Sequence, residues 1–392
     1  MLYIQDPSYA GSKQLLDAIL ECCPTAHIGA GAYAFVSADG INLLVGDPVF
    51  TTFLERGQFL LIIGMDEITN TRSLAALNHY MTLFPNLQVK AFLHNTTGST
   101  FHPKFCWFDC GDHGFVITGS GNLTQKGMQR NREAFEAKTV TSDELAVIVQ
   151  YWNSWLESVS EFLLPLDDEA VVQRAEENVH RMQAVRPRRA RVVRRPRAEV
   201  PVGEQATAQE DNPTEEETTE QVTFVDDELG SWEYDPLSAV LICEIPRGER
   251  RWNQANFDAN TFQTYFESTP GVAGQMALIL RDVKHDGSLG EIRHRPPVSV
   301  ASHNYRIELY VARGTVYPDD GRVLGVFVKL SSRTFLYSLV FPTDSEYPVL
   351  QAKLDRERQR HDRLVRYQTH AEELQSLAPT LPIIQYLSQA DY

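Results

Sequence analysis

The residues with the strongest chemical character lie in residues 101–136, FHPKFCWFDCGDHGFVITGSGNLTQKGMQRNREAFE. His102 and Lys104 are two residues apart, so on an extended strand their side chains point the same way. A second run of strand character leads into the turn GSGN, which contains Ser120 and Asn122, and Glu133 opens a third run. The pattern predicts that these five side chains meet at the ends of neighbouring strands.

An imidazole, an ammonium, an amide and a hydroxyl gathered in this way suit a phosphodiester substrate. Lys104 and Asn122 would bind the non-bridging oxygens, with support from Ser120, and His102 would attack phosphorus as a covalent nucleophile. Glu133 would accept the other imidazole N–H and hold His102 in its reactive tautomer. A lone histidine on a strand is more commonly a core or surface residue. Here, however, its spacing from Lys104 and the GSGN turn that follows favour a catalytic site.

The two motifs resemble those of the phospholipase D superfamily. HPK followed by GSGN is similar to the HxK…GSxN pattern, and Asp109 meets the longer HxKxxxxD spacing. The stretch from GSGNLT to Glu133 resembles the nuclease branch of the superfamily. The segment between Asp109 and Gly119 is longer than in the shortest form of the pattern, so we expect Asp109 to be structural.

This resemblance implies metal-independent hydrolysis through a phosphohistidine intermediate, with no cofactor and no metal ligands. It also implies two histidines, one as nucleophile and one as general acid, whereas the chain carries one copy of the motif. The second histidine would come from another subunit, and we therefore expect a homodimer with a shared site. The five cysteines form no pattern typical of zinc sites or disulfide frameworks.

The surrounding sequence predicts an α/β domain over residues 1–180. Apolar runs at 27–35, 41–46, 59–65, 87–94, 104–109, 114–119 and 133–140 are expected to be strands. Residues 68–84 and 143–163 have helical spacing, with Asn70 or Thr71 as an N-cap. The pattern is typical of a largely buried sheet covered by helices.

Charge separates the chain into two halves joined by a linker at 181–230. The whole chain of 392 residues has a formal net charge of −16, which taken alone argues against nucleic acid. However, residues 181–197 carry +8 and residues 198–230 carry −11, and residues 231–392 are close to neutral at −2. We predict a disordered linker here. Its acidic part, 204–228, either shields the nuclease cleft as a nucleic-acid mimic or is a solvated spacer.

A second, mainly β domain is expected over residues 231–345. Short apolar runs at 239–246, 275–283, 305–312, 323–330 and 334–341, with a helix at 256–268, favour a barrel or sandwich. Residues 346–392 are expected to form a charged helical extension. It is either a docking helix or a helix packed on its own domain.

Two polar, arginine-rich stretches of this domain are candidate DNA-contacting arms. Arginine can bind guanine, and asparagine or glutamine can bind adenine, through paired hydrogen bonds. The candidates are Arg247, Arg250, Arg251, Trp252, Asn253, Gln254, Arg293, Arg295, Ser302, His303, Asn304 and Arg306. The alternative is an ordinary polar surface with Trp252 and Tyr305 in the core.

RWNQANF and SHNYRIEL resemble the C-terminal B3-like DNA-binding domain of restriction endonucleases of the BfiI and NgoFVII group. The order of nuclease domain, linker and β-domain is the same. The resemblance implies a pseudobarrel whose two arms grip the major groove of double-stranded DNA. Some members of this group act with an ATP-driven, helicase-like subunit, and the helical extension suggests such a partner here.

The sequence therefore predicts a site-specific restriction endodeoxyribonuclease. Its lack of a leader or a long apolar run predicts a soluble, cytoplasmic protein without membrane contact. One alternative is a phosphodiesterase with the same core that acts on lipids or nucleotides. Another is a catalytically inert DNA-binding regulator.

Overall fold

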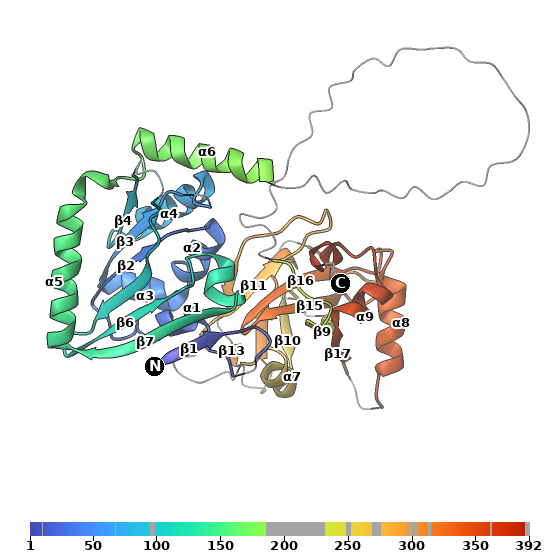
Figure 1. The fold of residues 1–392 in the computed structure, drawn as a ribbon. Coiled ribbons are helices and arrows are strands. Elements are labelled where there is room, and N and C mark those ends of the chain that lie inside the picture. Colours follow the sequence, from blue (N-terminus) through green and yellow to red (C-terminus); the bar gives the residue numbers. More distant parts are fainter. Residues whose placement is uncertain are drawn as a thin grey trace, which may run out of the picture.

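The computed structural model describes residues 1–9, 11–66, 68–94, 99–185, 232–247, 252–268, 276–295, 298–299, 305–312, 315–360 and 363–388. Most of the predicted linker, with the acidic stretch for which a shielding role was considered, lies outside these ranges. Figure 1 shows a first half in blue to green beside a second half in yellow to red. None of the helices in the described ranges is long and apolar enough to cross a membrane.

The first half is built on an eight-stranded mixed sheet in the order β1-β7-β6-β5-β2-β3-β4-β8. The strands are β1 (Leu2–Gln5), β2 (Ile28–Tyr33), β3 (Gln58–Gly64), β4 (Leu87–Phe92), β5 (Lys104–Asp109), β6 (His113–Gly119), β7 (Glu133–Thr141) and β8 (Leu163–Leu164). β2, β3 and β4 are parallel, whereas β5, β6 and β7 pair antiparallel. The two motif strands, β5 and β6, are neighbours near the middle of the sheet.

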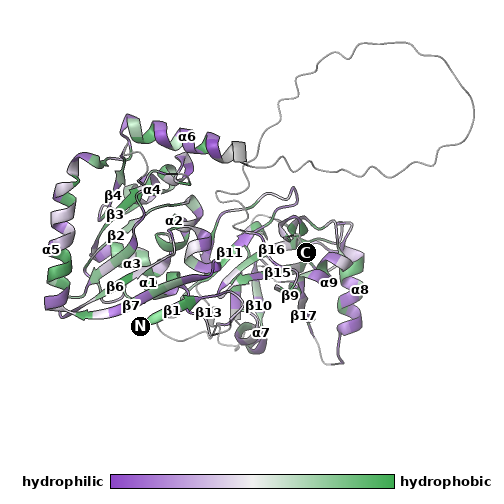
Figure 2. Cartoon of the chain, in the orientation of Figure 1, coloured by the Kyte–Doolittle hydropathy of each residue, from purple (hydrophilic) through white to green (hydrophobic). Residues whose placement is uncertain are grey.

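The two faces of this sheet are covered unequally. The helices are α1 (Leu15–Leu20), α2 (Ala38–Leu44), α3 (Pro48–Arg56), α4 (Thr71–Leu83), α5 (Ser142–Ser158) and α6 (Glu169–Val185). Residues of α1 to α4 share one large core with Leu61, Phe108 and Ile117 of the sheet. α5 packs on the opposite face, against Ala32 and Trp107. α6, whose hydropathy alternates along its length in Figure 2, buries Val171 and Ala175 in the larger core.

One predicted strand of the first half is wrong. Residues 41–46 lie in and just after helix α2, which begins after Ser37, whose side chain accepts a hydrogen bond from the backbone N–H of Gly40. This cap stabilises a helix start immediately before the apolar run. The helix predicted at 68–84 is confirmed as α4, and Asn70 is its N-cap.

The second half contains a six-stranded sheet in the order β12-β11-β16-β15-β9-β17 and a three-stranded sheet in the order β10-β14-β13. The strands are β9 (Ala239–Glu244), β10 (Gln254–Phe257), β11 (Leu278–Asp282), β12 (Arg293–Arg295), β13 (Val298–Ser299), β14 (Tyr305–Glu308), β15 (Leu324–Ser331), β16 (Thr334–Val340) and β17 (Arg366–His370). Within the described ranges the two sheets do not close into a barrel. The helix expected at 256–268 is reduced to α7 (Ala259–Thr264), because residues 254–257 pair as β10.

The C-terminal extension is part of the second domain and not a separate docking helix. It forms α8 (Tyr347–Glu357), β17 and α9 (Ala371–Leu377), and β17 adds an edge strand to β9. Leu350, Leu354 and Leu374 are fully buried in the same core as β9 and β15. The predicted continuous helix is broken because the chain turns back to pair with the sheet.

A buried polar interface joins the two halves. Asp39 of α2 accepts hydrogen bonds from Trp232 Nε1 (2.6 Å) and from the guanidinium of Arg281 on β11 (2.7 Å). The side chains of Asp39 and Arg281 are only 4% and 7% exposed. Arg281 also stacks over the indole of Trp232, 4.7 Å from the ring centroid. Arg333 pairs with Asp17 of α1 at the same interface. A buried charge of this kind is tolerated only with its partners in place.

Candidate active site

His102 and Lys104 lie at the start of β5. The backbone N–H of Ala34 donates to the carbonyl of Pro103 (2.8 Å), which ties the segment before β5 to the end of β2. Lys104 Nζ lies 3.0 Å from His102 Nδ1 and 3.2 Å from Nε2, and it donates to the carbonyl of His102 (3.1 Å). The imidazole is exposed and Lys104 is half-buried. The two side chains thus form one cationic and nucleophilic pair.

The turn after β6 is held against β7. The backbone N–H of Ser120 donates to the carbonyl of Ala134 (3.0 Å), and the N–H of Ala134 donates to the Ser120 hydroxyl (3.1 Å). A Cβ at Gly121 would lie 2.6 Å from Leu15 Cδ2 and 2.8 Å from the carbonyl oxygen of Gly127. Glycine is therefore required at this position for packing within the turn.

Asn122 is fixed by the loop between β2 and α2. The backbone N–H of Phe35 donates to Asn122 Oδ1 (3.3 Å), and the N–H of Ser37 donates to the carbonyl of Leu123 (3.0 Å). The amide oxygen of Asn122 is thus turned toward Phe35, and its amide nitrogen is the donor that it can offer to a substrate. The ring of Phe35 also meets the His102 imidazole edge-on, at 5.9 Å between centroids, so Asn122 and His102 share one neighbour.

Glu133, the first residue of β7, completes the cluster through a different partner than predicted. Its carboxylate accepts hydrogen bonds from the Ser120 hydroxyl and from Asn131 Nδ2 (3.0 Å). Its hydrogen bonds in the described structure do not include His102, whose ring contacts Lys104 instead. The predicted Glu133–His102 hydrogen bond is therefore wrong for this single chain, and Glu133 orients the Ser120 turn.

Two positioning residues were missed from the sequence. Gln5, at the end of β1, donates to the carbonyls of Gly127 (3.1 Å) and Asn131 (2.9 Å). It also accepts from the backbone N–H of Leu15 (2.9 Å). These bonds fix the π-helical segment Lys126–Arg130, and with it Asn131 beside Glu133. Asn131 was visible in the sequence segment NRE, but the role of Gln5 depends on a contact across more than a hundred residues.

Burial and charge act in opposite directions on Lys104. Partial burial lowers the pKa of its ammonium, and the negative field of Glu133 raises it. Burial is the larger effect, so the pKa lies below the ordinary lysine value. The Glu133 carboxylate thus keeps Lys104 protonated to a higher pH than burial alone would allow.

The other motif residue, Asp109, has a structural role, as expected. Its carboxylate accepts from the backbone N–H of Gly111 (2.8 Å) in the turn between β5 and β6. Gly111 has φ +88°, a left-handed conformation that favours glycine. No group of three or more histidine, cysteine or acidic side chains in the described ranges could together hold a metal ion.

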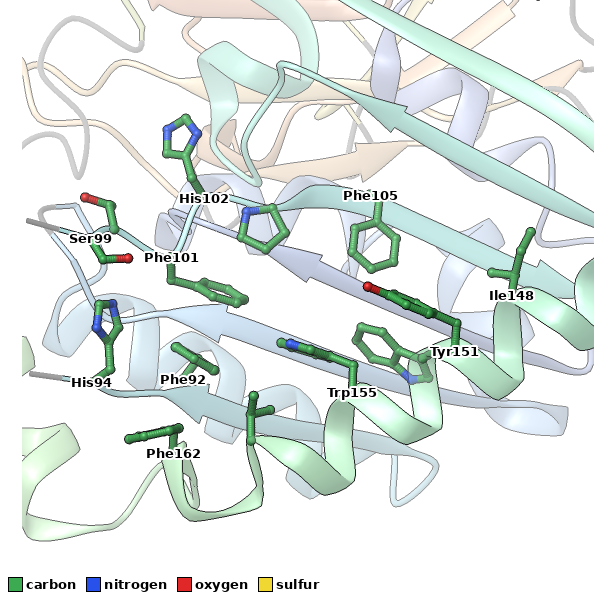
Figure 3. Close-up of a pocket in the computed structure, with 14 residues that line it drawn as sticks. Phe92, His94, Ser99, Phe101, His102, Phe105, Ile148, Tyr151, Trp155 and Phe162 are labelled. Atoms are coloured by element: carbon green, nitrogen blue, oxygen red, sulfur yellow. The ribbon is translucent and has the colours of Figure 1, made fainter. Parts of the chain in front are cut away.

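An aromatic cavity of about 480 Å³ begins beside His102. Its lining residues come mainly from α5, β4 and the approach to β5, and include Phe92, Phe101, Phe105, Tyr151, Trp152 and Trp155. Figure 3 shows His102 at one end of this row, with its ring turned away from the aromatic rings. Phe92 and Phe101 stack at 4.4 Å, and Tyr151 is 78% exposed. His102 thus lies at the rim of the cavity, and its imidazole points away from the aromatic rings.

The candidate DNA-contacting residues of the second half have different environments. Trp252 is buried, and its Nε1 donates to the carbonyl of Thr315 (2.7 Å), so it is a core residue and not a DNA contact. Arg250, Arg251, Ser302, His303 and Asn304 lie outside the described residues. The backbone carbonyl of Asn253 accepts from Leu309, and its side chain is half-buried.

The remaining candidate arginines fall into two groups. Arg247 pairs with Asp319, Arg293 with Glu291, and Arg295 with Glu308. Arg306 of β14 instead donates to amide oxygens, to Gln254 Oε1 (2.8 Å) and to Asn256 Oδ1 (3.2 Å) of β10. Arg306 and Gln254 are among the predicted DNA-contacting residues, and Asn256 is not.

No protein-family model and no curated protein sequence matches this chain. Among solved structures it is similar to NucT from Helicobacter pylori, with 16% identity and a TM-score of 0.30, over 42% of this chain and 96% of that one. It is also similar to Nuc, a phospholipase D family member from Salmonella typhimurium, with 18% identity and a TM-score of 0.29, over 42% and 97%. A third similarity is to the phosphatidylserine synthase of Haemophilus influenzae, with 16% identity and a TM-score of 0.32, over 47% and 45%.

Proposed function

We propose that the chain is a phospholipase-D-like phosphodiesterase that uses His102 as a covalent nucleophile. The observation that carries this proposal is that the ends of three neighbouring strands bring His102 and Lys104 into contact on one side, and Ser120 and Glu133 on the other, with the charge of Glu133 acting on Lys104. Asn122 is held between them by Phe35, whose ring also contacts His102. The exposed imidazole is open to a substrate, and Lys104 and Asn122 offer donors for its non-bridging oxygens.

The proposed reaction has two steps. A ring nitrogen of His102 forms a bond to phosphorus as the bond to the leaving oxygen breaks, and a general acid protonates that oxygen. Water then attacks the phosphohistidine and gives a proton to the group that acted as general acid in the first step, while the phosphorus–nitrogen bond breaks and releases His102. Neither step requires a metal ion, since Lys104 and Asn122 would balance the developing charge.

The general acid is proposed to be His102 of a second copy of the chain. One imidazole cannot be both the nucleophile and the acid in the same step, and the described cluster brings in no second histidine that contacts His102. A two-fold homodimer would place the two copies of His102 on opposite sides of one phosphate. Exposure of His102 in the single chain supports this arrangement.

We propose double-stranded DNA as the substrate, cleaved at a specific site as in a restriction system. The support is the polar face on the β10–β14 ribbon of the second half, since a two-stranded ribbon fits the major groove. A B3-like pseudobarrel and a helicase-like ATPase partner remain proposals that go with this function. The interface at Asp39 and Arg281 would hold such a reading surface at a fixed distance from His102.

Plasmid cleavage by the purified full chain in excess EDTA tests this function. We expect discrete double-strand products from the wild-type chain and none from His102→Ala. If both proteins leave the plasmid intact, the assay is repeated with ATP and the candidate partner subunit. Intact DNA under those conditions as well would support the inert DNA-binding regulator.

A lipid phosphodiester is a second candidate substrate, favoured by the aromatic cavity beside His102. Exposed Tyr151 and the rings of Trp155 and Phe92 form an apolar surface of a size suited to a small ligand. Release of a headgroup from phospholipid vesicles in EDTA, lost in His102→Ala, would support this candidate. Absence of release together with DNA cleavage would exclude it.

A further inference from the structure

The three-stranded sheet of the second half carries a small polar cluster that directs hydrogen-bond donors outward. In the antiparallel pair β10–β14, Asn256 lies opposite Arg306, and Gln254 lies opposite Glu308. The alternate residues Ala255, Phe257 and Ile307 are buried in the core, whereas Gln254, Asn256 and Arg306 are half-buried. These three polar residues therefore share the outer face of the ribbon with Glu308, whose carboxylate is paired with Arg295 at 3.4 Å.

The hydrogen bonds within this cluster turn the amide oxygens of Gln254 and Asn256 toward Arg306. Arg306 Nε donates to Asn256 Oδ1 (3.2 Å), and a terminal nitrogen of Arg306 donates to Gln254 Oε1 (2.8 Å). A guanidinium has donors only, so both amides must turn their oxygens toward it. Among the described residues, the amide nitrogens of Gln254 and Asn256 and the second terminal nitrogen of Arg306 make no hydrogen bond, so their N–H groups can bind a ligand.

We infer that this donor-only cluster reads a guanine edge in the major groove, and that Asn256 belongs to the recognition surface. Guanine presents two acceptors there, N7 and O6, whereas adenine and cytosine each present a donor. Outward-facing donors therefore complement guanine best, because they mismatch the exocyclic amines of adenine and cytosine, and because thymine offers them one acceptor, O4, beside a methyl group. This inference rests on the proposed DNA-cleaving function and adds its base specificity.

The contrast with the neighbouring arginines favours Arg306 for this role. Arg247, Arg293 and Arg295 each have a carboxylate partner, which competes with a nucleic acid for the guanidinium. The partners of Arg306 are neutral amides that orient it without neutralising its charge. The cluster thus combines a fixed geometry with a retained positive charge, the combination that paired recognition of guanine requires.

Selection from a random duplex library tests the inference, with the full-length His102→Ala chain used so that bound DNA is not cut. We expect the recovered site to contain a guanine whose replacement by any other base weakens binding by about 10-fold or more. Replacing that guanine with 7-deazaguanine, which lacks the N7 acceptor, is expected to weaken binding as well.

Variants in the same His102→Ala background then assign the guanine to the cluster. Asn256→Asp keeps the oxygen that Arg306 uses but loses the outward N–H donor, so the ribbon is expected to stay folded. It should reduce the preference for that guanine by about 10-fold and leave other positions unchanged. Arg306→Ala should do the same. In either variant, replacing the guanine with 7-deazaguanine should cause little further loss of binding affinity.

Asn260→Asp on the exposed surface of α7 is the matched control, since it adds the same charge outside the cluster. It is expected to weaken binding slightly and uniformly, without a change in base preference. Thermal melting of each variant verifies that the chain is folded.

Three results would overturn the inference. The first is a recovered site without an essential guanine. The second is that 7-deazaguanine weakens DNA binding by the same factor in the variants as in the parent chain. The third is that Asn260→Asp changes the base preference as much as Asn256→Asp does. If the parent chain enriches no sequence at all, the proposed site-specific function fails, and the base assignment fails with it.

Discussion

Glu133 connects the separate parts of the candidate site. Its carboxylate joins the Ser120 turn to Asn131 and supplies the negative field that acts on Lys104. The HxK and GSxN residues were predictable from the sequence because each motif is local. The actual partners of Glu133, and the support from Gln5, depend on the register of β1 and β7 and could not be read from spacing.

The pH dependence of hydrolysis should report this arrangement. Lys104 must be protonated to bind the phosphate, and its pKa is lowered mainly by burial, so kcat/KM should fall at a pH below the ordinary lysine range. Glu133→Gln removes the charge that raises the pKa of Lys104, so this alkaline limb should move to lower pH. A pH–rate profile of both proteins provides the measurement. A limb that stays in place, or moves to higher pH, would show that Glu133 does not act on Lys104.

At the scale of elements, one strand and one short helical segment determine the site. β1 pairs with β7 through Gln5 opposite Glu133, and Gln5 reaches the π-helical segment that follows the GSGN turn. The sequence predicted most strands of the first sheet, because their apolar runs are long and clearly bounded. It assigned 41–46 to a strand because an apolar run alone does not distinguish a buried helix from a strand.

Gln5→Ala should weaken both the fold and catalysis. The change leaves the Gly127 and Asn131 carbonyls and the Leu15 N–H without their partner in a buried site. We expect a loss of about 2 kcal/mol in the free energy of unfolding. We also expect a lower kcat with little change in KM, measured by denaturant unfolding and steady-state kinetics. Gln58→Ala, at an exposed position of β3, should change neither. Unaltered kcat in Gln5→Ala would contradict the positioning role.

For the whole molecule, the buried contacts between the halves decide how recognition and cleavage are related. The charge blocks in the sequence indicated two domains and a linker, but no local pattern indicated that Asp39 would meet Arg281 and Trp232 across some two hundred residues. Such contacts depend on the docking of two complete folds. They support a rigid connection between the β10–β14 ribbon and the His102 cluster.

Asp39→Asn should be strongly destabilising. The substitution keeps the size of the side chain but leaves Arg281 as an uncompensated buried charge, so we expect a loss of about 3–5 kcal/mol. Thermal unfolding of the full chain measures this. The control, Asp167→Asn, changes an exposed carboxylate and should leave Tm unchanged. Equal Tm values for both variants would mean that the interface contributes little.

Cutting the chain between the halves should not separate them. A specific protease site placed between residues 200 and 220 would divide the chain outside all described contacts. Because Asp39–Arg281, Asp17–Arg333 and Gln129–Thr334 bridge the interface, the two fragments should elute together in size-exclusion chromatography. Separate elution of folded fragments would contradict a rigid connection.

The central claim is that His102 becomes covalently bound to the phosphate of the substrate. The most direct measurement is intact-mass analysis of the full chain, mixed in EDTA with a cleavable oligonucleotide and quenched within one turnover under alkaline conditions. We predict a protein species heavier by one cleaved strand, with the adduct mapped to His102 and absent in His102→Ala. Cleavage of the oligonucleotide without such an adduct, or an adduct that persists in His102→Ala, would contradict the account.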